Sequence, residues 1–153
     1  MKQSILLFWL SLSLAISGVG QLHKVKDIEI PILTEGTAKW PIKLTKQLFE
    51  DDTIYNLTFR DAGPNSTGKI STQGFFIFEL KAFGDALQTA LSIDSEYEIH
   101  FKDGTIEKTG SESKHRQIFI RFASGTGSFI TTEIAAMKLI HAIRKESNFR
   151  YKR

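Results

Sequence analysis

Apolar and polar residues alternate strictly in two short stretches of the chain, residues 55–61 and residues 97–103. Each stretch reads aromatic, polar, aliphatic, polar, aromatic, and then a cation followed by aspartate. Strict alternation is typical of a β-strand that buries one face and exposes the other. Turn residues, a second apolar run and a helical pattern follow both stretches. We therefore predict a folding module that occurs twice in the chain.

The first module is predicted to contain two strands and a helix. Tyr55–Arg60 is the first strand, and a loop dense in turn residues leads to a second strand over Lys69–Phe78. Phe75–Phe78 is apolar on both faces, which indicates either a strand covered on both sides or a surface that meets a partner. The helix is expected over Leu80–Leu91 because its apolar residues fall on one face. Gly84 inside it marks close packing against the sheet.

The second module is predicted to begin with a hairpin. Tyr97–Lys102 and Ile106–Thr109 are its strands, and Asp103-Gly104 is the expected two-residue turn. A further strand is predicted over Gln117–Phe122. The module ends in a helix over Glu133–Lys145, in which four residues form the predicted buried stripe, namely Ala136, Leu139, Ile140 and Ile143.

Two segments precede these modules. Val25–Leu33 alternates like a strand, and Pro31 within it lacks a backbone donor, which favours an edge strand. Lys43–Glu50 is predicted as a short helix because Leu44 and Leu48 fall on one side.

These elements predict an α+β fold in which two β-β-α units form one antiparallel sheet, with both helices packed on one face of the sheet. The layout resembles the duplicated saddle of TATA-box-binding proteins. The resemblance concerns the arrangement of elements alone, so it carries no function. The strand at residues 25–33 and the additional strand of the second unit lie outside that layout.

The pattern of residues at the N-terminus indicates a secretory signal peptide. Lys2 precedes an apolar run of about a dozen residues, short of the ~20 that a spanning helix needs. Small residues follow, and we place cleavage after Gly20, with Ser17 as the alternative. We expect residues 21–153 to form a single α+β domain that is secreted or periplasmic, with no membrane span.

Composition limits the functional classes. The chain has 20 Lys and Arg against 17 Asp and Glu among 153 residues, and a net charge of +3 is too small to indicate a nucleic-acid partner. It contains no cysteine, which excludes disulfides, thiolate metal sites and a cysteine nucleophile. We expect no cofactor.

The sequence contains only weak signs of a catalytic site. The four histidines, His23, His100, His115 and His141, lack the spacing of a zinc hydrolase, so no metal site is predicted. Asp61 and Asp103 end the two alternating stretches and could act as an acid–base pair in a cleft, but aspartate commonly begins a turn. A hydrolase that uses Asp61, Asp103 or His100 is therefore the least favoured hypothesis.

Three features indicate binding instead. Phe76 and Phe78 belong to the run that suits a partner surface. Lys138, His141 and Lys145 share one face of the last helix, either as a site for an anionic surface or as an ordinary solvated face. The loop Ser124–Ser128 offers backbone donors for an anion, although Gly and Ser also mark plain loops.

We therefore predict a non-catalytic binding protein with a protein partner, which a second copy of the chain would also satisfy. The alternative is a carrier of a small apolar or anionic ligand held between the sheet and the helices.

Overall fold

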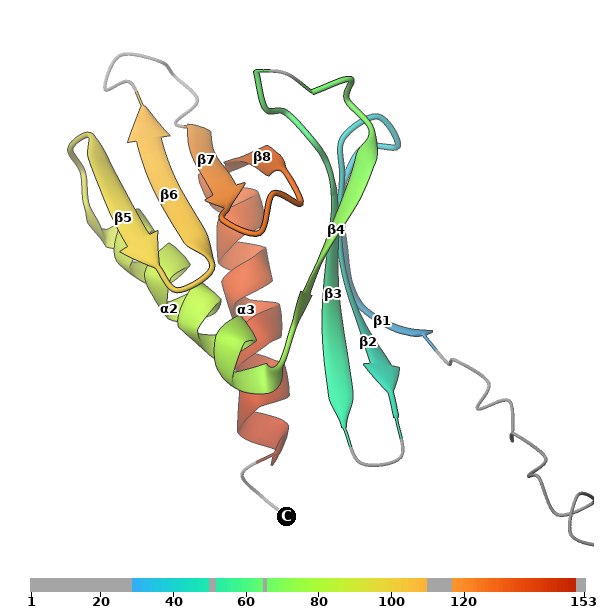
Figure 1. Cartoon of the computed structure of the whole chain (residues 1–153). Coiled ribbons are helices and arrows are strands. Elements are labelled where there is room, and N and C mark those ends of the chain that lie inside the picture. The colour runs from blue at the N-terminus through green and yellow to red at the C-terminus, as the bar shows by residue number, and fades with distance from the viewer. Residues whose placement is uncertain (1–28, 50–51, 65, 110–116, 151–153) are drawn as a thin grey trace, which may run out of the picture.

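The structure is a computed structural model, and it describes residues 29–49, 52–64, 66–109 and 117–150. In this part of the chain, eight strands form two four-stranded antiparallel sheets, and two helices pack against them (Figure 1). The predicted α+β class is confirmed. The expectation of one shared sheet is wrong, because no hydrogen-bonded strand pair among the described residues joins the two sheets. The predicted signal peptide lies outside the described residues.

The first sheet is built by the earlier half of the described chain, and its strands follow sequence order across the sheet. It comprises β1 (Glu29–Gly36), β2 (Pro41–Leu48), β3 (Thr53–Arg60) and β4 (Ile70–Phe75), and the helix α2 (Ile77–Ser92) follows. The alternation predicted for β3 is confirmed, since Tyr55, Leu57 and Phe59 are buried and the residues between them are partly exposed. β1 is an edge strand, as Pro31 indicated.

The second sheet repeats this order of elements. It comprises β5 (Tyr97–Phe101), β6 (Gly104–Thr109), β7 (Gln117–Phe122) and β8 (Ser128–Thr132), and the helix α3 (Glu133–Arg150) follows. The predicted stripe of α3 is confirmed as buried. The β5–β6 turn is Lys102-Asp103 rather than Asp103-Gly104, because Gly104 already pairs with Phe101. Glycine is required there because a Cβ would overlap the carbonyl oxygen of Arg121 on β7.

The segment Lys43–Glu50, predicted as a helix, instead forms most of strand β2; Glu50 itself lies outside the described residues. Ile42 and Leu44 are buried on either side of exposed Lys43, which is the period of a strand. β2 also bonds to β1 on one edge and to β3 on the other. Pairing on both edges outweighs a weak local preference for helix.

The two alternating stretches do not occupy equivalent places. Tyr55 lies in the third strand of the first sheet, whereas Tyr97 lies in the first strand of the second sheet. Each helix follows four strands, so the predicted β-β-α units are too short. The prediction failed because the four-residue spacing of Leu44 and Leu48 in β2 also suits a helix. With a helix placed there, the first predicted unit could not include β1 and β2.

One apolar core joins the two sheets and the helices. The ring of Phe122 on β7 lies at its centre, 5.5 to 6.4 Å from five other rings. These rings come from β3, β4, α2, β5 and β8, and belong to Phe59, Phe75, Phe83, Phe101 and Phe129. Tilted and stacked aromatic pairs of this kind add to the free energy gained by burial alone.

Each helix contacts both sheets. α2 contacts β3 and β4 of the first sheet, which it follows, and also β5 and β6 of the second, whereas α3 contacts β8 of the second sheet and also β1 of the first. Lys46 on β2 pairs with Glu146 on α3 at 2.9 Å. The helices also touch each other closely, since a Cβ on Gly84 would lie 2.9 Å from Cγ2 of Ile143. Gly84 therefore does mark close packing, but the partner is α3 rather than a sheet.

Lys108 on β6 is a buried lysine with partners from both helices. Its Nζ donates to the carbonyl oxygen of Ile93 at 2.7 Å and lies 3.3 Å from Oε1 of Glu133. Ile93 is the C-cap of α2, and Glu133 is the first residue of α3. The cation therefore lies where the dipole of α2 is negative and next to an acidic side chain. It ties the ends of both helices to the second sheet.

Replacing Lys108 with methionine keeps most of the aliphatic volume but removes the charge. We expect the free energy of unfolding to fall by about 2–4 kcal/mol, because the carbonyl group of Ile93 and the carboxylate of Glu133 each lose a buried charged partner. The matched control is Lys102→Met, which removes an exposed lysine paired with Glu79 and should change stability far less, because solvent screens an exposed ion pair. Urea unfolding measures both values, and equal losses would contradict the role of Lys108.

Candidate functional site

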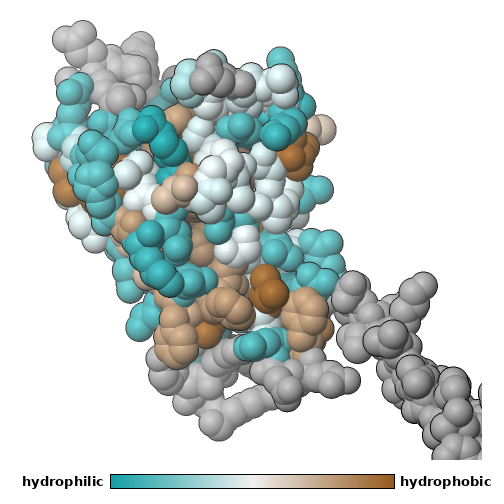
Figure 2. All heavy atoms as spheres, in the orientation of Figure 1, coloured by the Kyte–Doolittle hydropathy of each residue, from teal (hydrophilic) through white to brown (hydrophobic). Residues whose placement is uncertain are grey.

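Large apolar side chains are exposed at one end of the first sheet. Phe78 is 74% exposed and Phe76 is 51% exposed, and Leu48 and Phe49 are also exposed. We call these four residues the aromatic end. Leu48 pairs with Thr53, and Phe76 directly follows the last residue of β4, so the β2–β3 hairpin and the start of α2 lie at the same end of the sheet. Figure 2 shows apolar side chains gathered at this lower end of the molecule.

Phe76 is exposed because its neighbours take the buried positions. β4 ends at Phe75, which is buried, and α2 begins at Ile77, which packs against the core. Of the two explanations for the Phe75–Phe78 run, a mid-sheet strand covered on both sides is therefore wrong. A partner surface stays as a prediction.

The helix cap does not explain a phenylalanine at position 76. Phe76 is the N-cap of α2, and its backbone N–H donates to Oε2 of Glu79 at 3.0 Å. Helices prefer Ser, Thr, Asp or Asn at this position because their side chains accept a hydrogen bond from the first turn. A phenyl ring cannot do so. The residue is thus poor for the helix and leaves an aromatic ring in solvent.

The basic row on α3 is exposed as predicted from its periodicity, but its charge is partly matched. Lys138 donates to both carboxylate oxygens of Glu35 on β1, each at 3.0 Å. His141 and Lys145 are exposed on the same helix. An anion would therefore compete with Glu35 for Lys138, which weakens the case for an anionic partner on this row.

The loop Ser124–Ser128 binds a carboxylate of the protein itself. The backbone N–H of Ser128 donates to Oδ1 of Asp61 at 2.9 Å, and Ala62 donates to the carbonyl oxygen of Ser128 at 2.7 Å. Gly127 has φ +129°, and a Cβ there would lie 2.9 Å from Cγ of Asp61. Of the backbone donors that suggested an anion cradle, the N–H of Ser128 is thus directed at Asp61 and the N–H of Gly125 at the carbonyl oxygen of Phe122, and the loop connects the second sheet to the end of β3.

A second contact fastens this loop to β4. The side-chain oxygen of Gln73 accepts hydrogen bonds from Ser124 at 2.8 Å and from Thr126 at 2.6 Å. Gln73 also donates to the carbonyl oxygen of Gly74. The loop is therefore held on two strands of the first sheet, which favours a structural role.

Asp61 is adapted to stay ionised. Partial burial raises the pKa of its carboxyl group, but hydrogen bonds from Ser128, Gly63 and Ser66 outweigh burial, so the net pKa lies below its usual value. A carboxyl group held in this state is poorly suited to act as a general acid near neutral pH. Asp103 contributes a different contact, since its backbone carbonyl accepts from Ala123 at 2.8 Å.

The remaining groups of interest are dispersed. His100 is exposed on β5, with Nε2 3.5 Å from Oε1 of Glu98. His23 and His115 lie outside the described residues. Across the described ranges, no three His, Cys, Asp or Glu side chains come together as metal ligands. In the same part of the chain, neither helix is both long and apolar enough to cross a bilayer.

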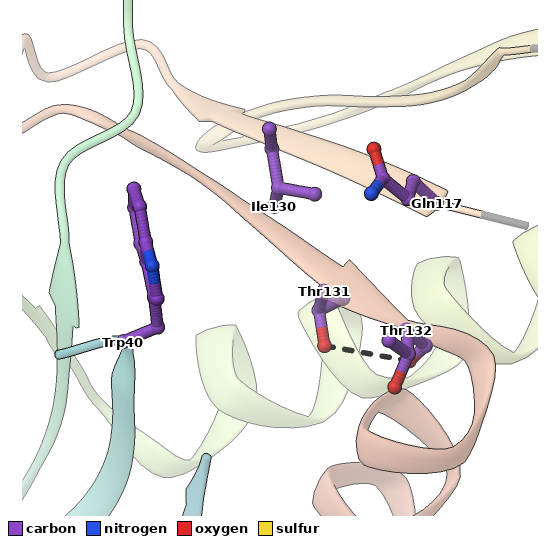
Figure 3. Close-up of a pocket in the computed structure, with 5 residues that line it drawn as sticks. All are labelled: Trp40, Gln117, Ile130, Thr131 and Thr132. Carbon is purple, nitrogen blue, oxygen red and sulfur yellow. Dashed lines mark hydrogen bonds between the residues drawn. The ribbon is translucent and has the colours of Figure 1, made fainter. Parts of the chain in front are cut away.

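A cleft lies between the β1–β2 turn and the second sheet (Figure 3). Its volume is about 360 Å³, and its walls come from the turn and from β7 and β8. The residues that line it are Trp40, Gln117, Ile130, Thr131 and Thr132. Figure 3 shows the indole of Trp40 edge-on, with Ile130 across from it. Trp40 was not among the site residues predicted from the sequence. The one signal for it was a tryptophan in a turn, where burial is not expected.

No protein-family model matches the chain, and no curated protein matches its sequence. The functional proposals therefore rest on the aromatic end and on the cleft beside Trp40.

Asp61→Asn tests the connection between the two sheets. Ionised Asp61 stabilises the fold above its unfolded pKa of about 3.9, and this contribution is lost as the pH falls through the lower folded value. We expect the variant to be less stable than wild type by about 1–2 kcal/mol at neutral pH, with the difference shrinking as the pH drops below about 4.

Asp103→Asn is the matched control, because Asp103 makes its inter-segment contact through the backbone. Its stability difference from wild type should stay small from neutral to acidic pH. Unfolding followed by circular dichroism over this range measures both variants. If the stability difference between Asp61→Asn and wild type does not change with pH, the charge does not have this role.

Proposed function

We propose that the protein is a small binding protein that acts outside the cytoplasm, secreted or periplasmic, after removal of residues 1–20. In this proposal the aromatic end contacts a protein partner, which includes a second copy of the chain. Catalysis is not part of the proposed function.

The observation that carries the proposal is the pair of exposed rings, Phe76 and Phe78. Exposed single apolar residues are common, but these two flank Ile77 at the start of α2, and Leu48 and Phe49 are exposed at the same end of the sheet. Exposed apolar surface gathered in one region marks interaction sites in soluble proteins. Aromatic residues, phenylalanine among them, are also enriched at the cores of protein interfaces.

The N-cap position adds an independent reason. A sequence that departs from the local preference of its helix does so most often at functional sites. Phe76 departs from the capping preference while its backbone preserves the cap through Glu79. This combination supports a role for the ring itself, because the fold does not depend on it.

A carrier with its ligand between the sheets and helices is less well supported. That region is packed with Phe122 and the five phenylalanine rings that contact it. The rings are buried or nearly so, and a ligand of useful size would have to displace them.

The double variant Phe76→Asp, Phe78→Asp tests the proposal. Asp at position 76 supplies a good N-cap, worth about 1 kcal/mol, which offsets the loss of the half-buried ring. We therefore expect a folded protein of nearly unchanged stability that loses association. Light scattering over a concentration series measures self-association, and affinity capture with chemical cross-linking from the extracytoplasmic fraction measures binding of a partner.

The matched control is Ile70→Asp. Ile70 is an equally exposed apolar residue, 51% exposed, at the other end of β4. The substitution Ile70→Asp introduces the same kind of charge at a position of similar exposure, and it should leave association unchanged. If the double variant self-associates and captures the same protein as wild type, the aromatic end is not the interaction surface.

A further inference from the structure

We propose that the Trp40 cleft is a second binding site, separate from the aromatic end, and that it binds the ring of an uncharged pyranose sugar. The site is formed where the β1–β2 turn of the first sheet approaches β7 and β8 of the second (Figure 3). It goes beyond the proposed protein interaction, since neither Phe76 nor Phe78 lines it.

Trp40 has the properties of a fixed platform. Its backbone N–H donates to the carbonyl oxygen of Thr37 at 3.0 Å and to Oγ1 of Thr37 at 3.2 Å, which sets the geometry of the turn. The guanidinium carbon of Arg60 lies 5.6 Å from the centre of the indole. A cation over the ring at this distance is attractive. The indole is therefore held in position before a ligand arrives, although half of the residue is exposed.

The fold gives no local reason for a tryptophan at this position. Turns favour Gly, Pro, Asn, Asp and Ser, which stabilise the bend through their backbone preferences or short side chains. Trp40 follows Lys39 and precedes Pro41, and its ring does not belong to the apolar core. An exposed indole that is braced on Arg60 but left out of the core is expected where the ring contacts a ligand.

The cleft combines apolar walls with a polar rim. The indole and the side chain of Ile130 face each other, and both are about half exposed. Gln117 supplies an amide that can donate and accept. Thr132 accepts from the backbone N–H of Ala135 through Oγ1 at 3.3 Å, which leaves its hydroxyl hydrogen directed elsewhere. Thr131 is buried beneath them.

This chemistry selects the ligand. A pyranose ring has faces of C–H groups, which stack on the negative face of an indole, and an edge of hydroxyl groups, which match an amide and a hydroxyl. None of the lining residues in the described part of the chain is charged, and the guanidinium of Arg60 lies over the indole of Trp40 rather than in the lining, so the lining itself offers hydrogen bonds and apolar contact. The volume of about 360 Å³ lies near the lower limit for ligand pockets and suits one ring.

The fluorescence of Trp40 provides a direct test. The chain has two tryptophans, Trp9 and Trp40, so the full chain with Trp9→Phe carries Trp40 as its single tryptophan. The probes are methyl β-D-glucopyranoside, methyl α-D-mannopyranoside, methyl β-D-galactopyranoside and N-acetylglucosamine. We expect at least one to change the emission in a saturable manner, with a Kd of about 0.1–10 mM because an open cleft contacts a single ring. Saturation-transfer NMR should show the ring C–H protons in contact with the protein.

Variants in and away from the cleft make the test specific. Trp40→Ala should weaken binding, measured by NMR, by at least about tenfold. Gln117→Ala should weaken it by about threefold to tenfold through the loss of one hydrogen bond. The double variant Phe76→Asp, Phe78→Asp should bind the sugar as wild type does, so failure of this site and failure of the proposed protein interaction are distinguishable. Circular dichroism confirms that each variant is folded.

Three results would overturn the inference. One is that none of the four sugars changes the emission up to about 100 mM, which is tenfold beyond the expected range. Another is that Trp40→Ala binds the sugar with the same Kd as wild type, measured by NMR titration. The third is that glucuronate binds more tightly than methyl β-D-glucopyranoside, or that phenol binds while all four sugars fail, because the cleft would then select an anion or an aromatic ring.

Discussion

The fold depends on a core that neither sheet could form alone. Phe122 on β7 contacts rings from β3, β4, α2, β5 and β8, so its environment is complete only when both sheets and α2 are in place. Small domains are stabilised mainly by such shared burial, and this chain has no disulfide to compensate for a smaller core. The contact of each helix with both sheets follows from the same requirement, because each helix also covers apolar surface that the other half contributes.

Polar contacts then determine how the two sheets meet. The carboxylate of Asp61 accepts from Ser128, and Gln73 accepts from Ser124 and Thr126, so one loop of the second sheet is fastened to two strands of the first. The same approach of the sheets leaves a gap farther along, where Trp40 faces Ile130. The loop Ser124–Ser128, which resembled an anion site in the sequence, is therefore structural. Trp40, which belongs to none of the sequence motifs, lines the cleft.

Hydrophobic periodicity predicted much of this fold, namely both helices with their buried faces and the alternating strands β3, β5 and β7. It failed at β2, where apolar residues spaced four apart suited either a helix or a strand, and only the neighbouring strands decide between them. That error also produced the wrong pairing of Tyr55 with Tyr97. For the binding surfaces, the Phe75–Phe78 run was visible in the sequence. The Trp40 cleft was not, because its walls are brought together by contacts between segments far apart in the chain.

The link between the first described strand and the last described helix bears on the order in which the protein folds. Glu35 on β1 pairs with Lys138 on α3, a separation of 103 residues, so the earliest described strand is covered by the latest helix. During synthesis from the N-terminus, the first sheet has no complete cover until α3 has emerged. A nascent chain with this topology cannot complete the cover of its first sheet before α3 has been synthesised, so the two sheets and the helices have to assemble together.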